Sequence, residues 1–161
     1  MELTVDTNLD DLTMTVVATF DHPVGRVWDL YADPRKLERF WGPPTYPATV
    51  TTHELAPGGE VVYFMTSPEG QRHYGRWDVQ QVDAEKAFSV IDTFADEHGV
   101  ALEGMPVMRM DFTFETTGDG SRMQCLTTFP DLATLEQSLQ MGMEEGLRGS
   151  MGQMESVLAD A

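Results

Sequence analysis

The sequence is poor in cysteine and in basic residues. Cys125 is its single cysteine, which excludes an internal disulfide. Only 10 Lys and Arg stand against 27 Asp and Glu, giving a formal net charge of −17 at pH 7. A surface of that sign repels the phosphates of nucleic acids and the headgroups of anionic membranes. We therefore expect neither nucleic acid nor a membrane as a partner.

Long apolar runs and cofactor motifs are also missing. No stretch approaches the roughly 18 apolar residues that a membrane-spanning helix needs. The first residues lack the basic and then apolar character of a secretory signal, so we expect a cytoplasmic protein. Histidine, cysteine and acidic residues do not gather at metal-ligand spacing, and there is no phosphate-binding loop or nucleophile elbow. The sequence thus predicts no metal and no cofactor.

The sequence does contain a regular succession of β-branched and aromatic segments separated by turn residues. Residues 1–11 show little periodicity and are predicted to form an N-terminal extension. Residues 12–161 carry no linker-like stretch and are predicted to form a single domain. Two short helices, over 24–31 and 34–41, should follow the first strand. The seven predicted strands cover 12–20, 46–55, 60–66, 73–82, 86–94, 106–115 and 121–129.

The last stretch, residues 131–159, is predicted to be one long amphipathic helix. Its apolar residues recur at spacings of three and four, which places them on a single stripe. A helix of this length is roughly 40 Å long, more than a flat sheet of a small domain can cover. The fold class is therefore α+β, with a curved antiparallel sheet wrapped around the helix. The stripe consists of Leu135, Leu139, Met143, Leu147, Met151, Met154 and Leu158.

Alternation within the strands predicts which side chains face that helix. Between residues 108 and 114 the even positions are apolar and should point inward. A cavity between the sheet and the C-terminal helix would suit a small hydrophobic or aromatic ligand, because methionine walls adapt to several shapes. Alternatively, the same residues fill a solid core. The predicted lining residues are Tyr63, Trp77, Phe94, Met108, Met110, Phe112, Met143 and Leu147.

Two polar residues share the inward phase. His73 is in phase with Trp77, and Asp92 is in phase with Phe94. A desolvated carboxylate has a raised pKa and can act as general acid or base, so Asp92 and His73 are the catalytic candidates. The alternative is a solvated or hydrogen-bonded structural role for both. No complete catalytic motif is present, so binding is preferred over catalysis.

Four segments together resemble a known family. They are ATFDHPVGRVWDLYADPRKLERFWGPP (18–44), ELAPGGEVVYFMTSPEG (54–70), FADEHG (94–99) and GMEEGLRGSMGQMESVL (142–158). The chain resembles the START-like, or SRPBCC, superfamily, in its branch of homologues of the heat-shock-protein ATPase activator. The resemblance implies a helix-grip fold, with seven antiparallel strands around a C-terminal helix and a hydrophobic cavity between them. It also implies a homodimer as a candidate assembly.

Three functions are compatible with these features. The first is binding of a small hydrophobic or aromatic ligand, which needs only the predicted interior. The second is a cyclase- or dehydratase-like enzyme that uses the same cavity, as the resemblance to polyketide cyclases of the superfamily implies. The third is an acidic, co-chaperone-like interaction module with a filled core.

Overall fold

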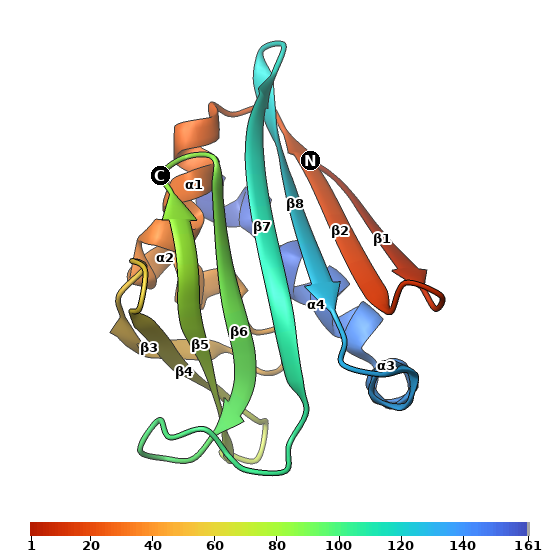
Figure 1. Ribbon diagram of the computed structural model, residues 1–161. Helices are drawn as coiled ribbons and strands as arrows, with labels where there is room; N and C mark the ends of the chain where they lie inside the picture. Colours follow the sequence, from red (N-terminus) through yellow and green to blue (C-terminus); the bar gives the residue numbers. More distant parts are fainter. Residues whose placement is uncertain (161) are drawn as a thin grey trace.

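The structure, a computed structural model, describes residues 1–160 and consists of one eight-stranded antiparallel sheet with five helices (Figure 1). The strands lie in the order β1-β2-β8-β7-β6-β5-β4-β3. Helices α1, α2 and α4 lie on one face of the sheet, so the fold is α+β, as predicted. The strands are β1 (Glu2–Asn8), β2 (Thr13–Phe20), β3 (Ala48–His53), β4 (Glu60–Thr66), β5 (Arg72–Asp83), β6 (Ala87–Ala95), β7 (Val107–Thr117) and β8 (Gly120–Thr128).

The two short helices expected after residue 20 are present. Helix α1 covers Val24–Ala32, and α2 covers Pro34–Phe40. Asp33 separates them, and its side chain accepts a hydrogen bond from the backbone N–H of Arg35 at 2.9 Å. Pro34 occupies the first turn of α2, where its missing N–H leaves no bond unmade. An aspartate cap followed by proline therefore starts the second helix.

The prediction of seven strands was wrong, because residues 2–8 form an eighth. Strand β1 pairs with β2 in antiparallel register, from Glu2 opposite Thr19 to Asn8 opposite Thr13. The tight turn between them includes Leu12 at φ 58°. As an edge strand, β1 buries only Val5, so its sequence lacks a clear apolar alternation. The alternation of apolar residues therefore did not predict this strand.

The prediction of one continuous helix over 131–159 was also wrong. The segment forms α3 (Leu132–Gln140), α4 (Met143–Met151) and α5 (Met154–Ala159). Gly142 stands between α3 and α4 at φ 85°, a left-handed conformation that ends the first helix. Between α4 and α5, Gly152 and Gln153 keep right-handed helical angles, so these two helices run on from one another. The apolar stripe continued across Gly142, and its periodicity hid the break.

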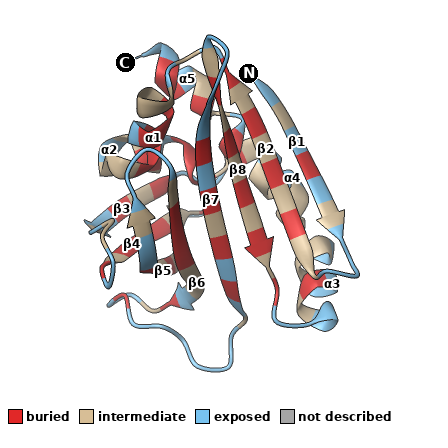
Figure 2. Cartoon of the chain, turned by 45° about the horizontal axis from the view of Figure 1, so that its top comes forward, coloured by how far each residue is buried: buried red, intermediate tan, exposed pale blue. Residues whose placement is uncertain are grey.

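The core lies between the helices and the sheet, where the buried residues gather (Figure 2), and it is rich in aromatic rings. Phe88 and Phe112 stack with their ring centroids 4.3 Å apart, and the indoles of Trp41 and Trp77 meet edge to face at 4.8 Å. The predicted inward phase of residues 108–114 is confirmed, since all four even positions are buried. Closely packed rings fill this central part of the molecule.

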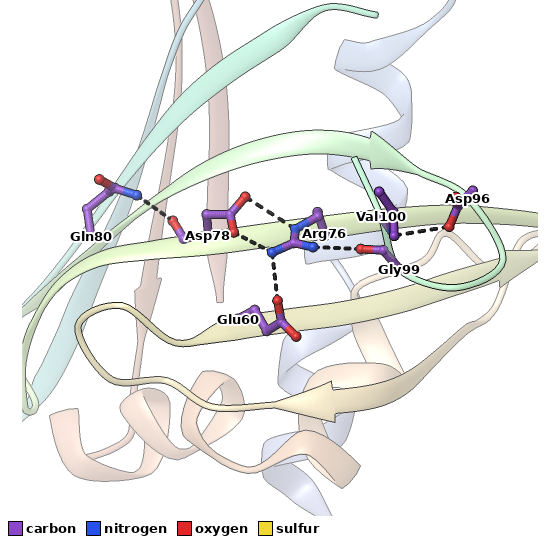
Figure 3. Close-up of polar contacts among 7 residues, drawn as sticks. All are labelled: Glu60, Arg76, Asp78, Gln80, Asp96, Gly99 and Val100. Carbon is purple, nitrogen blue, oxygen red and sulfur yellow. Dashed lines mark hydrogen bonds and ion pairs between the residues drawn. The ribbon is translucent and has the colours of Figure 1, made fainter. Parts of the chain in front are cut away.

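The loop between β6 and β7 folds back onto the outer face of the sheet (Figure 3). There Arg76 donates a hydrogen bond of 2.7 Å to the carbonyl oxygen of Gly99. The same guanidinium pairs with Glu60 and Asp78, each at 2.6 Å. Gly99 also lies against Val62, which explains why this outward-facing side chain is buried. Arg76 thus anchors the loop to strands β4 and β5.

Candidate ligand-binding site

A pocket of about 120 Å³ opens at the end of the sheet where the β4–β5 turn and the β6–β7 loop lie. This is the lower end of the sheet in Figure 1. Strands β4 to β7 supply every residue that lines it. The lining residues are Tyr63, Met65, His73, Tyr74, Gly75, Asp92, Thr93, Phe94 and Met108.

Strand register arranges the inward side chains in rows across the sheet. Because antiparallel partners lie opposite one another, each row crosses several strands. The pocket occupies the three rows nearest the open end, and the rows behind it belong to the aromatic core. From the open end, the rows are Met65 with His73; Tyr63 with Gly75 and Phe94; and Val61 with Trp77, Asp92 and Met108.

Tyr63 is positioned by the glycine opposite it. A Cβ atom on Gly75 would lie 2.6 Å from both Cζ and the hydroxyl oxygen of Tyr63, so the ring rests directly on the bare backbone. From there the hydroxyl donates to Oδ1 of Asp92 at 3.4 Å. Glycine inside a strand often marks such a close approach. The pair Gly75 and Tyr63 therefore directs a hydroxyl at the pocket carboxyl.

The environment of Asp92 favours its neutral form. Removal from water raises its pKa from 3.8 to about 7, and the hydrogen bond from Tyr63 opposes that rise. Burial, and next the nearby Asp92 charge, raise the pKa of Tyr63 well above 10, so its hydroxyl keeps its proton. Asp92 is still partly accessible, whereas His73 is exposed at the mouth. A carboxyl group that titrates near neutral pH thus lies in the pocket wall.

Two indoles lie behind Tyr63. The ring centroids of Trp41 and Trp77 are 6.3 and 6.4 Å from that of Tyr63. Both Nε1 atoms are buried and have no hydrogen-bond partner within residues 1–160. Their N–H groups act on the Tyr63 hydroxyl and oppose the rise in its pKa, although neither reaches good hydrogen-bonding geometry. The proton of the Tyr63 hydroxyl is directed by its own hydrogen bond to Asp92.

The predicted site residues separate into three groups. Tyr63, Phe94 and Met108 line the pocket together with Asp92 and His73. Trp77, Met110 and Phe112 are buried in the core, with at most 2% exposure each. Met143 and Leu147 lie half-buried on α4 and pack against the core, but they do not line the pocket. The pocket wall is therefore made by strands rather than shared with a helix.

Four lining residues were missed as site residues. Met65 shares the alternation of Tyr63, a predicted lining residue two positions before it, but it was not assigned to the cavity. Gly75 offered a signal, since an isolated glycine within a strand marks a bulge or a close contact. Tyr74 and Thr93 follow the opposite alternation, and no sequence pattern would have selected them.

A second, more open hollow of about 550 Å³ lies over β5, β6 and β7. Phe112 is the one predicted lining residue at this hollow, and its ring is fully buried.

Within residues 1–160 no helix is both long and apolar enough to cross a membrane. In the same part of the chain, no group of three or more His, Cys, Asp or Glu is placed to hold a metal ion.

The antiparallel sheet, the helices on its face and the apolar pocket together define an SRPBCC, or START-like, domain. Within that class, residues 21–159 match the family described as Activator of Hsp90 ATPase homolog 1-like protein, and the chain belongs to this family.

Solved structures agree with the family. The crystal structure of a Mycobacterium smegmatis protein is 42% identical, with a TM-score of 0.89 and 98% and 97% of the two chains covered. A solution structure from Arthrobacter aurescens is 39% identical, with a TM-score of 0.91 and 98% and 92% covered. A protein from Silicibacter pomeroyi shares the fold at 20% identity, with a TM-score of 0.73 and 91% and 97% covered. No curated protein matches this chain.

Proposed function

We propose that the protein binds a small apolar or aromatic molecule in the pocket between β4 and β7. The observation that carries this proposal is an open, mainly apolar pocket at the end of a closely packed aromatic core. Its 120 Å³ is close to the volume of about 150 Å³ of an engineered cavity, in another protein, that binds benzene. A single ring, or an aliphatic group of similar size, therefore matches the available space.

The side chains of the walls support the same ligand class. Met65 and Met108 contribute flexible thioethers that adjust to different shapes. Tyr63 and Phe94 add aromatic surface, and Phe94 remains 40% exposed at the open end. An exposed phenylalanine at a pocket mouth loses contact with water when a ligand covers it, which favours binding.

Binding is tested with benzyl alcohol as the probe, followed through the methionine methyl signals in NMR titrations. We expect saturable shifts at Met65 and Met108. The substitution Met108→Trp should fill the pocket and abolish these shifts at Met65. Met141→Trp, on the exposed C-terminal side of α3, is the matched control and should bind as the unchanged protein does. Undiminished binding by a folded Met108→Trp variant would refute the pocket as the site.

A second candidate function, general acid–base catalysis, is favoured by one observation. The pKa of Asp92, about 7, lies in the range where a group both gives and takes protons near neutral pH. On this hypothesis Asp92 transfers the proton and Tyr63 orients the substrate. Once a substrate is found, Asp92→Asn should reduce turnover by about a hundredfold while leaving substrate affinity largely unchanged. Equal turnover would exclude Asp92 as the catalytic group.

A further inference from the structure

We propose that the ligand is a small organic cation, with an ammonium group held by Asp92 and a ring-sized apolar body held by the rest of the pocket. This inference rests on the proposed function and adds the chemical class of the ligand.

The first argument is the charge of the site. Its ionisable side chains are Asp92, His73 and two tyrosines, and neither lysine nor arginine lines it. The whole chain carries a formal charge of −17. A carboxylate ligand would enter a negative field and meet another carboxyl group, with no fixed cation to balance it. A cation is attracted by both the field and the pocket.

The second argument is an unused hydrogen-bond acceptor. Oδ1 of Asp92 accepts from the Tyr63 hydroxyl, whereas Oδ2 receives no hydrogen bond within residues 1–160. Asp92 is partly accessible and lines the pocket. Because Oδ2 is not a buried unpaired atom, it faces water in the pocket, and an ammonium group can replace that water with up to three donors. The free oxygen thus matches the head of such a ligand.

The third argument is the arrangement around that oxygen. Tyr63 belongs to the row in front of Asp92, and its hydroxyl, at the far end of the ring, reaches Oδ1 of Asp92. Trp41 and Trp77 lie behind the same tyrosine, whose hydroxyl donates to Asp92. Tyr63 therefore occupies one carboxylate oxygen and leaves the other for the ligand.

The row order also predicts the orientation of the ligand. Asp92 lies in the third row from the open end, behind Phe94 in the second and His73 in the first. The ammonium group would therefore enter first. The apolar body would follow and lie against Met65 and Phe94, in the two rows nearest the mouth, while Met108 lies beside Asp92 in the third row.

The test uses three probes with the same ring: benzylamine, benzyl alcohol and benzoate. Affinities are measured by calorimetry or NMR at about pH 8, where Asp92 is mostly ionised and an alkylammonium group stays protonated, as lysine does. We expect benzylamine to bind at least about tenfold more tightly than benzyl alcohol, and benzoate to bind most weakly. In Asp92→Asn the preference for the amine should disappear. Asp6→Asn, which removes an exposed carboxylate of β1, is the control and should preserve it.

The outcomes separate the two proposals. If none of the probes binds the unchanged protein, both the ligand-binding function and the cation inference fail. If benzyl alcohol or benzoate binds as tightly as benzylamine, the pocket stands and the cation inference is overturned. An amine preference that survives in Asp92→Asn overturns it as well. If Asp92→Asn does not fold, the comparison of the three probes on the unchanged protein still tests the cation inference.

Discussion

The ring of Tyr63 rests on Gly75, the residue opposite it in the neighbouring strand, so closely that a single added methyl group would lie 2.6 Å from the phenolic oxygen. This contact directs the hydroxyl toward Asp92 and leaves space in front of it for the pocket. The properties of the site therefore depend on the absence of a side chain at one position.

The substitution Gly75→Ala should displace Tyr63. The added methyl overlaps the ring, and overpacking of this kind lowers the free energy of unfolding by about 1–3 kcal/mol. Denaturation with urea measures the change. A variant as stable as the unchanged protein, with Tyr63 still bonded to Asp92, would contradict the contact described here.

Removal of the Tyr63 hydroxyl should raise the pKa of Asp92 further. The hydroxyl donates to the carboxylate and so favours its ionised form. Tyr63→Phe deletes this donor and keeps the ring that covers Gly75. A titration of the Asp92 carboxyl carbon by NMR reports the shift. A lower or unchanged pKa in Tyr63→Phe would show that the hydrogen bond does not form in solution.

Asp92 should make the folded protein less stable as the pH rises toward 7. Its pKa is about 7 in the folded state and 3.8 without the influence of the fold, so between these values the folded state holds a proton that the unfolded state has released. Stability from this group is present at low pH and is lost as the pH rises through 7. Urea denaturation at pH 5 and pH 8 should show that Asp92→Asn gains more stability relative to the unchanged protein at pH 8 than at pH 5, where only part of the loss has occurred.

The pH experiment needs a control for the other titratable groups that lie near Asp92. Tyr63 stays neutral in this range, and burial raises the pKa of Cys125 to about 12. His73 lies at the pocket mouth, so His73→Gln serves as the control. If His73→Gln rather than Asp92→Asn abolishes the pH dependence, the assignment to Asp92 is wrong.

Arg76 should control the mobility of the β6–β7 loop. Replacement by lysine keeps the charge but loses the planar group that reaches Gly99, Asp78 and Glu60 together. We expect amide hydrogen exchange at residues 98–101 to become at least about tenfold faster in Arg76→Lys. Unchanged exchange would mean that Asp96, which accepts from the N–H groups of His98 and Val100, and the backbone hydrogen bond from Leu102 to Phe94 hold the loop without Arg76.

Two glycines of the C-terminal segment should respond to alanine in opposite directions. Gly142 has φ 85°, so Gly142→Ala should cost roughly 1–2 kcal/mol of stability. Gly146 lies inside α4 with open space at its Cβ position, so Gly146→Ala should add roughly 0.5–1 kcal/mol. Thermal denaturation of the pair is decisive, since a stabilising Gly142→Ala would imply a continuous helix through that position.

The sequence by itself determined much of the sheet. Alternation and turn residues located seven of its strands, and Glu60–Thr66 has the predicted bounds. The same alternation identified the inward face, including Met108 and Asp92. It did not reveal β1, whose edge position buries little, or the break at Gly142, which the apolar stripe crosses.

Only the tertiary structure decided which inward residues form the pocket. A period of two assigns a side chain to a face of the sheet, but its row depends on pairing between strands that are distant in sequence. That pairing puts Phe112 in the core, Phe94 at the mouth and Asp92 between them. The chemistry of Asp92 follows from this place, because burial and the hydroxyl of Tyr63 set its pKa.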